Sequence, residues 1–275
     1  MSSNVPARIA ERLSSVLKRF QPIVSSAKAR DVNEADTVVI VIDLLAELFG
    51  FDKYSEITRE HSIKSTFCDL AIKLDGRIEF LIEVKAVGLE LKDAHVKQAV
   101  DYAANQGVEW VALTNGSLWR VYRVSFAKPI DQQLVLDLDL LTLSPKNGED
   151  LDNLFLLTRE SIVRSGLVAY HDHKEATSRF FLAAILLSEP VLETVRRELR
   201  RVAPDVRIAV DEVRDTLVNE VIKRDVMEGP KADQARKKVA KSAGKMLRIR
   251  KGKGEEDADT VTIDAPSTAV VNAER

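Results

Sequence analysis

The sequence predicts an α/β domain followed by an all-helical C-terminal region. Two pairs of short apolar runs flank Asp75-Gly76 and Asn115-Gly116, and these dipeptides are strong signals for β-hairpins. Segments with helical spacing precede and separate the two hairpins. Beyond a turn-rich break at residues 144–148 only helical patterns follow. The order helix, hairpin, helix, hairpin indicates a small α/β core rather than an all-helical or all-β domain.

Composition sets the broad class of protein. The chain has 275 residues and 45% hydrophobic composition, enough for one or two domains with buried cores. Residues 1–30 carry scattered charges and no continuous apolar run, so we expect neither a signal peptide nor a membrane span, and a cytoplasmic protein. The single cysteine, Cys68, excludes an internal disulfide and is interpreted as a small core side chain.

Two helices are expected before the first hairpin. The first occupies residues 1–30, starts near Pro6 and has apolar residues at steps of three and four: Ile9, Leu13, Leu17 and Phe20. Asn33 is a favourable N-cap for the second helix. This helix is expected to run to Leu48 or Phe49, with Gly50 as its stop signal. Its apolar composition predicts that it is buried.

Strands are expected at Phe67–Leu74 and Ile78–Val84, and a helix at Lys92–Gln106 closed by Gly107. The second hairpin pairs 109–114 with 118–124. These elements define an α/β domain at residues 31–143. A helical region is expected at residues 150–250, and a disordered tail at 254–275 because its composition is polar and small. The expected helices of that region are Thr177–Leu187, Pro190–Val202 and Asp205–Arg224.

The first candidate functional residues lie in Glu83-Val84-Lys85, at the end of a predicted strand. Residues two apart in a strand point the same way, so the carboxylate and the ammonium can act on one ligand. The pattern alone is weak, because Glu90-Leu91-Lys92 and Asp172-His173-Lys174 match it without a preceding strand. The predicted strand and its partner therefore have to distinguish Glu83-Val84-Lys85 from the other two matches.

Asp69 lies on the partner strand of the same hairpin. With a three-residue loop, Leu74-Asp75-Gly76, residues 69, 81, 83 and 85 share a face. Two carboxylates on one face repel unless a positive group lies between them, and a hard divalent ion, Mg²⁺ or Mn²⁺, meets that need. Asp69 and Glu83 are the candidate metal ligands. Lys85 would orient or deprotonate an attacking water and offset negative charge during hydrolysis of a phosphodiester.

These residues resemble a known family. Asp69, then Glu83-Val84-Lys85, then Gln98 and Tyr102 as Gln-x-x-x-Tyr, are similar to the PD-(D/E)xK nuclease domain at the N-terminus of type I restriction enzyme R subunits. The neighbouring runs HVKQAVDYA at 95–103, WVALTNG at 110–116 and LWRVY at 118–122 strengthen the resemblance, which covers about residues 33–124.

The resemblance implies a restriction-endonuclease-like fold and a Mg²⁺-dependent DNA endonuclease. It also implies that Gln98 and Tyr102 support the DNA or the metal site, and four-residue spacing puts them on one helix face. The family's helical glutamate falls on Glu34, and helical phase favours Glu34 over Glu47 because Glu47 points away from the apolar face. The candidate catalytic residues are Glu34, Asp69, Glu83, Lys85, Gln98 and Tyr102.

Two features depart from the family pattern. Cys68 replaces the proline that names the motif, a common variation in this superfamily. No Gly-x-x-x-x-Gly-Lys-Ser/Thr loop occurs in the chain, so no ATP site is expected and a complete restriction motor subunit is excluded. The chain therefore resembles a free-standing nuclease-type domain.

Several alternatives stay open. Asp69, Glu83 and Lys85 could form a surface ion-pair cluster, and Tyr102 could be a core aromatic. The fold could serve a catalytically silent nucleic-acid-binding or scaffold protein, or the helical region could carry the function as an oligomerisation module, for instance a homodimer. Residues 231–253 hold ten Lys or Arg against one acidic residue, and this run is either a DNA-contacting segment or a solvated helix end.

Overall fold

The computed structural model describes residues 5–63, 66–126 and 130–256, without the side chains of residues 60–67, 93, 98 and 244–256. The chain divides into two compact units, Met1–His171 and Asp172–Arg275. Residues 257–275 of the expected C-terminal tail lie outside the described residues. Within the described part, no helix combines the length and the apolar composition that a membrane crossing requires.

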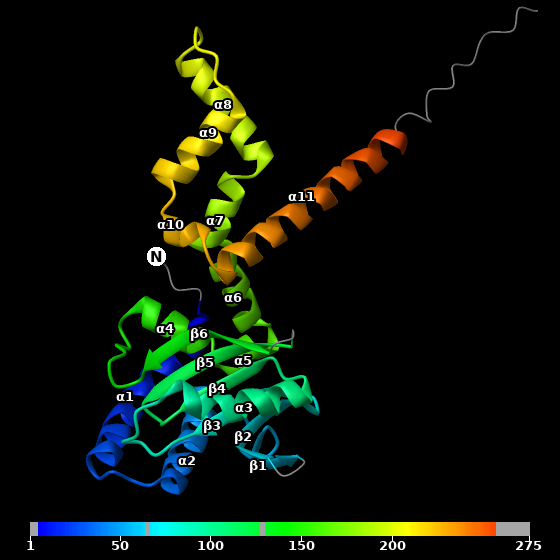
Figure 1. Ribbon diagram of the computed structural model, residues 1–275. Helices are drawn as coiled ribbons and strands as arrows, with labels where there is room; N and C mark the ends of the chain where they lie inside the picture. The colour runs from blue at the N-terminus through cyan, green and yellow to red at the C-terminus, as the bar shows by residue number, and fades with distance from the viewer. Residues whose placement is uncertain (1–4, 64–65, 127–129, 257–275) are drawn as a thin grey trace, which may run out of the picture. The chain divides into compact units, whose positions relative to one another are not determined.

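The first unit is built around one mixed sheet with the strand order β1-β2-β3-β4-β5-β6 (Figure 1). β3 and β4 pair in parallel, and the other neighbouring strands pair antiparallel. A parallel pair needs a crossover connection, and α3 (Asp93–Gln106) supplies it. The strands are β1 (Ile57–Ile63), β2 (Thr66–Leu74), β3 (Arg77–Val84), β4 (Trp110–Thr114), β5 (Leu118–Ser125) and β6 (Asp131–Asp139).

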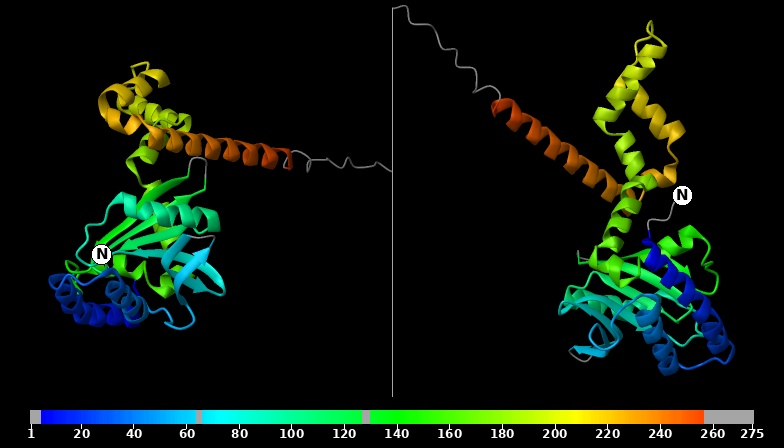
Figure 2. Two further views of the ribbon diagram at one scale, coloured as in Figure 1. Left: turned by 60° about the horizontal axis from the view of Figure 1, so that its bottom comes forward. Right: turned by 180° about the vertical axis from the view of Figure 1, so that it is seen from behind.

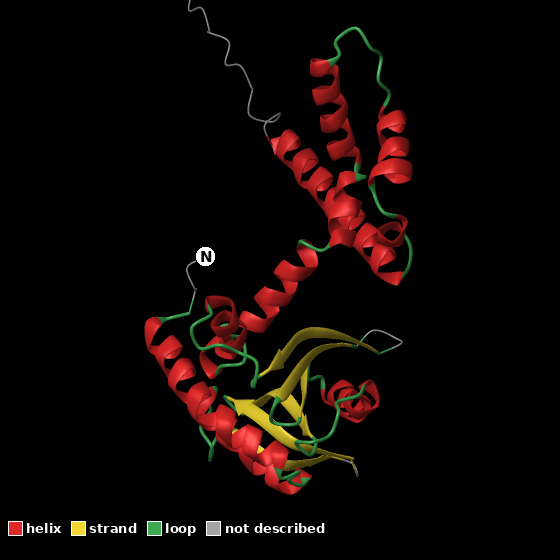
Figure 3. Ribbon diagram, turned by 90° about the vertical axis from the view of Figure 1, so that its left-hand side faces the viewer, coloured by secondary structure: helices red, strands yellow, loops and turns green. Residues whose placement is uncertain are grey.

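Helices cover both faces of this sheet (Figure 3). α1 (Ala7–Ala29), α2 (Glu34–Asp43) and the π-helical η1 (Leu44–Leu48) pack on one face in a large hydrophobic cluster. In that cluster the rings of Phe49 and Trp119 meet edge to face, with 5.1 Å between their centroids. α3 packs on the opposite face over a second cluster that includes Leu81 and Val111. The sheet is therefore buried on both sides, as an α/β architecture requires.

The helix boundaries expected before residue 110 are confirmed. The Asn33 side chain accepts a hydrogen bond from the backbone N–H of Asp36 at 2.9 Å and so caps α2. Gly50 ends the second helical segment with φ 81°, in the left-handed region that favours glycine over residues with a side chain. Gly107 ends α3 in the left-handed conformation with φ 69°.

The sheet is larger than the two predicted hairpins. Both hairpins are present, as β2 with β3 and β4 with β5, but the sequence analysis missed the outer strands β1 and β6. β1 has the sequence ITREHSI, which does not alternate apolar and polar residues. β6 has its three well-buried residues, Val135, Leu136 and Leu138, without strict alternation. Edge strands are buried less regularly than central ones, so hydrophobic periodicity did not identify them.

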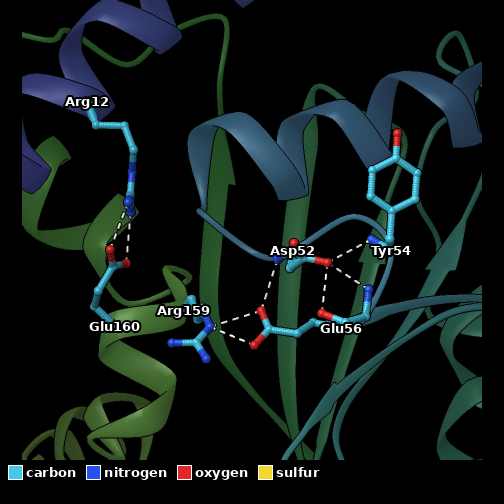
Figure 4. Close-up of polar contacts among 7 residues, drawn as sticks. Arg12, Asp52, Tyr54, Glu56, Arg159 and Glu160 are labelled. Atoms are coloured by element: carbon cyan, nitrogen blue, oxygen red, sulfur yellow. Dashed lines mark hydrogen bonds and ion pairs between the residues drawn. The ribbon is translucent and has the colours of Figure 1, made fainter.

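Ion pairs join α5 (Arg159–Val163) to two earlier segments of the first unit (Figure 4). Glu160 accepts two hydrogen bonds from Arg12 of α1, at 2.7 and 2.8 Å. The Nε of Arg159 donates to both carboxylate oxygens of Glu56 at 2.7 and 2.9 Å. Asp52, in the turn before β1, accepts hydrogen bonds from the two residues that follow Lys53 and so shapes that turn. α5 and the preceding α4 (Gly148–Phe155) therefore belong to the first unit.

The elements of the second unit in its described part are all helices, as predicted (Figure 2). The bounds expected for the helix Asp205–Arg224 were wrong, because this helical segment begins at Val210 and ends at Val221. α11 (Pro230–Glu256) packs against α7 (Arg179–Leu186) and then extends away from it. An open groove of about 930 Å³ lies between these helices and is lined mainly by alanine and other apolar residues. α6 (Gly166–Ala176) crosses from the first unit into the second, and the remaining elements are α8 (Glu189–Val202), α9 (Val210–Thr216), η2 (Leu217–Val221) and α10 (Arg224–Met227).

Candidate functional site

Glu83 and Lys85 meet at the end of the central strand β3. Glu83 is buried, with 4% of its surface exposed, on the sheet face that α3 covers, because Leu81 two residues earlier belongs to the α3 cluster. The Lys85 Nζ donates a hydrogen bond to Glu83 Oε1 at 2.7 Å. The backbone N–H of Lys85 donates to the Thr114 carbonyl on β4 at 2.8 Å, which continues the parallel pairing beyond β3. The expected convergence of these two side chains is confirmed.

Asp69 reaches the same site from β2, although the turn differs from the one predicted. The hairpin closes through the two-residue loop Asp75-Gly76, with φ 50° and 78°, because Leu74 pairs with Arg77. The three-residue loop was therefore wrong. A two-residue loop with both φ values positive matches the twist of the strands, and a bulge then adds one residue to β3.

Because of the bulge, Asp69 and Glu83 still lie on the same face of the sheet, although the turn is one residue shorter than predicted. Beyond it Leu70 pairs with Ile82, so the register continues with Asp69 opposite Glu83 instead of opposite Leu81. The Asp69 Oδ2 accepts a hydrogen bond from the Val84 backbone N–H at 2.7 Å. Asp69 is thus fixed against β3, on the face that carries Glu83.

Glu34, the first residue of α2, also approaches the site. Its Oε2 lies 3.6 Å from Lys85 Nζ. Glu47, the rejected candidate, forms an ion pair with Arg19 on α1. The choice of Glu34 over Glu47, made on helical phase and resemblance, agrees with this geometry.

Thr37 connects α2 to the segment that follows Lys85. Its hydroxyl donates to the Asn33 carbonyl at 2.8 Å and accepts from the Val87 backbone N–H at 3.1 Å, and the residue is completely buried. The helix that carries Glu34 is therefore joined directly to the chain two residues after Lys85. The sequence analysis missed Thr37, although a threonine inside the apolar run TVVIVID was a detectable signal.

Two further polar side chains hold the connection between β3 and α3. The Asn115 side-chain amide donates to the Leu89 carbonyl at 2.9 Å, and an Arg120 guanidinium nitrogen donates to the Leu91 carbonyl at 2.8 Å. The Asn115 Oδ1 also accepts from the backbone N–H of Leu118 at 2.8 Å. The sequence predicts Asn115 only as a turn residue, because its hydrogen bond to Leu89 joins segments 26 residues apart.

The site contains more acidic groups than basic groups. Burial raises the pKa of Glu83, Lys85 opposes the rise through its hydrogen bond, and the charges of Asp69 and Glu34 add to it. Burial lowers the pKa of Lys85, but the hydrogen bond with Glu83 and the neighbouring carboxylates raise it by more, so its net pKa lies above the ordinary value. One ammonium therefore faces three carboxylates when all are ionised.

This donor set fits a hard divalent cation. Asp69 and Glu83 lie on one sheet face and offer carboxylate oxygens, the ligands that Mg²⁺ and Mn²⁺ prefer, and a bound cation would relieve the repulsion between them. Asp69 and Glu83 are the residues that would hold such an ion. Lys85 stays protonated near neutral pH, which suits a hydrogen-bond donor better than a general base.

Cys68 and Tyr102 lie in the hydrophobic cluster beneath α3 rather than on an open surface. The Cys68 thiol donates to the Ile82 carbonyl at 3.2 Å, and burial, followed by the charges of Glu83 and Asp69, raises its pKa to about 12. Tyr102 is 2% exposed, and burial and then the neighbouring Cys68 raise its pKa. Cys68 is thus an inert core residue, as predicted. The side chain of Gln98 lies outside the described part of α3, so its expected role stays a prediction.

The fold and this cluster define an α/β domain with an acid-and-lysine site at the end of a central strand. Residues 40–134 match the family model described as type I restriction enzyme R protein N terminus (HSDR_N). The resemblance expected from the residues is therefore confirmed for this segment. The matched range contains Asp69, Glu83 and Lys85 and begins after Glu34. Searches among curated proteins and among solved structures returned no match.

Proposed function

We propose that residues 31–143 form a restriction-endonuclease-like nuclease domain that hydrolyses phosphodiester bonds of DNA with Mg²⁺ or Mn²⁺. The observation that carries this proposal is the convergence of Asp69, Glu83 and Glu34 around Lys85, with more negative charge than one ammonium balances. The family match of residues 40–134 supports it, because restriction enzymes act on DNA.

Each residue has a distinct task in this proposal. Asp69 and Glu83 hold the cation, which supplies Lewis-acid stabilisation of the phosphate oxygens when bound. Lys85 donates hydrogen bonds to the attacking water and offsets negative charge that develops on the phosphate. Glu34 keeps the Lys85 ammonium over the end of β3 through their 3.6 Å contact. The backbone N–H of Val84 donates to Asp69 Oδ2 at 2.7 Å and so fixes the position of this carboxylate beside Glu83.

DNA cleavage tests this proposal. Purified protein is incubated with supercoiled plasmid, linear duplex and single-stranded DNA in Mg²⁺, Mn²⁺ or EDTA. We expect cleavage in either metal and none in EDTA. Lys85→Ala and Asp69→Asn are expected to lower the rate at least about 100-fold, the usual loss when a group that stabilises the transition state is removed.

Lys92→Ala is the matched control, because Glu90-Leu91-Lys92 has the same sequence pattern without the strand. It should cleave at the wild-type rate. Equal cleavage by wild type and Lys85→Ala would contradict the proposal and favour the alternative, a catalytically silent nucleic-acid-binding or scaffold protein with this fold. The expected homodimer through the helical region stays a separate prediction.

A further inference from the structure

α11 has two chemically different faces in its described part, residues 230–243. Ala232 and Ala235 are buried at 3% and 0% exposure, and this face packs against α7. Lys237 and Lys241 are exposed and four residues apart, so they lie on a common face one turn of helix from each other. Helical phase puts that face on the side away from Ala235.

Carboxylates pair with other basic side chains of α11, but not with Lys237 and Lys241. Arg236 forms an ion pair with Asp233, and Lys238 binds Glu175 at 2.7 Å. Among the described residues, neither Lys237 nor Lys241 has an ion-pair partner. Arg196 and Arg201 of α8 contrast with them, since each is paired with a glutamate of its own helix.

The sequence continues the spacing of this pair. Positions 245 and 248 are Lys and Arg, four and seven residues beyond position 241, and residues 231–253 contain ten Lys or Arg against one acidic residue. The chain as a whole carries a net charge of −2, so this concentration of positive charge is local. Like charges four apart on a helix destabilise it slightly, and a polyanion would remove that cost.

We infer that the face of α11 carrying Lys237 and Lys241 binds the phosphate backbone of duplex DNA without sequence specificity. Lys237 and Lys241 are about 6 Å apart along the helix axis, a spacing close to that of neighbouring phosphates. The choice of DNA as the polyanion rests on the proposed function of the first unit.

The packing of α11 argues against a membrane surface as the partner. An amphipathic helix that inserts into lipid uses a free apolar face with large side chains. Here the apolar side chains of residues 231–243 are only alanines and one valine, Ala232, Ala235, Val239, Ala240 and Ala243, and the first two are buried. The face with Lys237 and Lys241 therefore binds a partner through electrostatic attraction and not through insertion of apolar side chains into lipid.

The experiment measures DNA affinity of the full chain by fluorescence anisotropy with a labelled 30-bp duplex of arbitrary sequence, in EDTA to prevent cleavage, at 50 and 200 mM salt. Each lost phosphate contact lowers the slope of log affinity against log salt by about 0.9. For Lys237→Gln/Lys241→Gln we expect a slope smaller by about 2 than in the wild type. The affinity ratio between the two salt concentrations then falls about tenfold.

Arg197→Gln/Arg200→Gln is the matched control, since it removes the same charge from exposed positions of α8. It should leave the slope unchanged. The inference is overturned if the α11 variant keeps the wild-type slope or if both variants lower the slope equally. It is likewise overturned if poly-glutamate displaces the labelled duplex from the protein as effectively as unlabelled DNA does. It is also overturned if the α11 lysines are needed for binding phosphatidylserine vesicles and not DNA.

Cleavage assays on the same proteins separate this inference from the proposed function. DNA binding that depends on α11 without any metal-dependent cleavage would contradict the proposed function and leave this inference standing. Metal-dependent cleavage with DNA affinity insensitive to the α11 variant would contradict this inference and leave the proposed function standing.

Discussion

Thr37 is a completely buried side chain whose hydroxyl serves two backbone groups. It satisfies the Val87 N–H at 3.1 Å and the Asn33 carbonyl at 2.8 Å, so it holds the start of α2 against the segment after Lys85. Because Glu34 is on α2 and Lys85 precedes that segment, the same bonds maintain the 3.6 Å contact between these two side chains. Thr37 acts on the site through position and not through contact with a substrate.

Thr37→Val keeps the volume of the side chain and removes its hydroxyl, which leaves the Val87 N–H buried without its acceptor. An unsatisfied buried donor costs about 1–3 kcal/mol, so we expect the free energy of unfolding in urea to fall by that amount. The cleavage rate should also fall in the variant at temperatures where it remains folded. Thr37→Ser, which keeps the hydroxyl, should restore both values. If Thr37→Val has the stability and the cleavage rate of the wild type, the hydrogen bond between Thr37 and Val87 does not position Glu34 relative to Lys85.

At the residue scale the sequence predicted the identity of the site better than its geometry. Glu83 and Lys85 share a face because strand residues alternate, and this rule needs no knowledge of the neighbours. The position of Asp69 depended on the hairpin register, and the bulge at Glu79 that sets it has no clear sequence signal. Thr37, Asn115 and Arg120 bind backbone groups far along the chain, which local patterns do not reveal.

At the scale of elements, a bidentate ion pair joins α1 to α5. Arg12 and Glu160 are 148 residues apart in sequence, and their side chains are 27% and 33% exposed. The hydrogen bond from Arg12 is the main reason that the pKa of Glu160 lies below its ordinary value of 4.5. Folding therefore favours the ionised carboxyl, and its contribution to stability is present at neutral pH and lost as the pH falls through the lowered pKa.

Glu160→Gln should consequently destabilise the protein at pH 7 by about 1 kcal/mol, the upper end for partly exposed pairs. The difference from wild type should shrink as the pH is lowered below about 4.5, because the carboxyl is then protonated first in the unfolded state and, as the pH falls through the lowered pKa, in the folded state as well. Urea unfolding of both proteins across pH 7 to 3.5 measures this. Glu11→Gln on α1, an exposed position, is the control and should show no such trend. A difference that grows toward acidic pH would contradict the assignment.

Elements with strong local signals were predicted, and elements defined by their neighbours were not. Asn33, Gly50 and Gly107 mark helix ends through capping and left-handed backbone, which are properties of single residues. β1 and β6 pair along the two edges of the sheet, and their sequences lack the periodicity of a half-buried strand. The α/β class thus followed from the sequence, whereas the six-stranded sheet required the tertiary pairing.

At the scale of the whole molecule, the two units differ in what their surfaces offer. The first unit contains the carboxylate and lysine site between β2, β3 and α2, together with both hydrophobic clusters around the sheet. The second unit presents exposed lysines on α11. We propose phosphodiester hydrolysis for the first unit and sequence-independent DNA affinity for the second.

Binding of Mn²⁺ measured by isothermal titration calorimetry tests the central claim most directly, because a bound cation distinguishes a nuclease site from an ion-pair cluster. The wild type should bind one Mn²⁺ in the carboxylate site, and Asp69→Asn should bind it at least about tenfold more weakly, since it loses an anionic ligand. Lys85→Ala should bind Mn²⁺ at least as tightly as the wild type, because it removes a competing cation. Equal Mn²⁺ affinity in wild type and Asp69→Asn, or no binding by the wild type, would contradict the account.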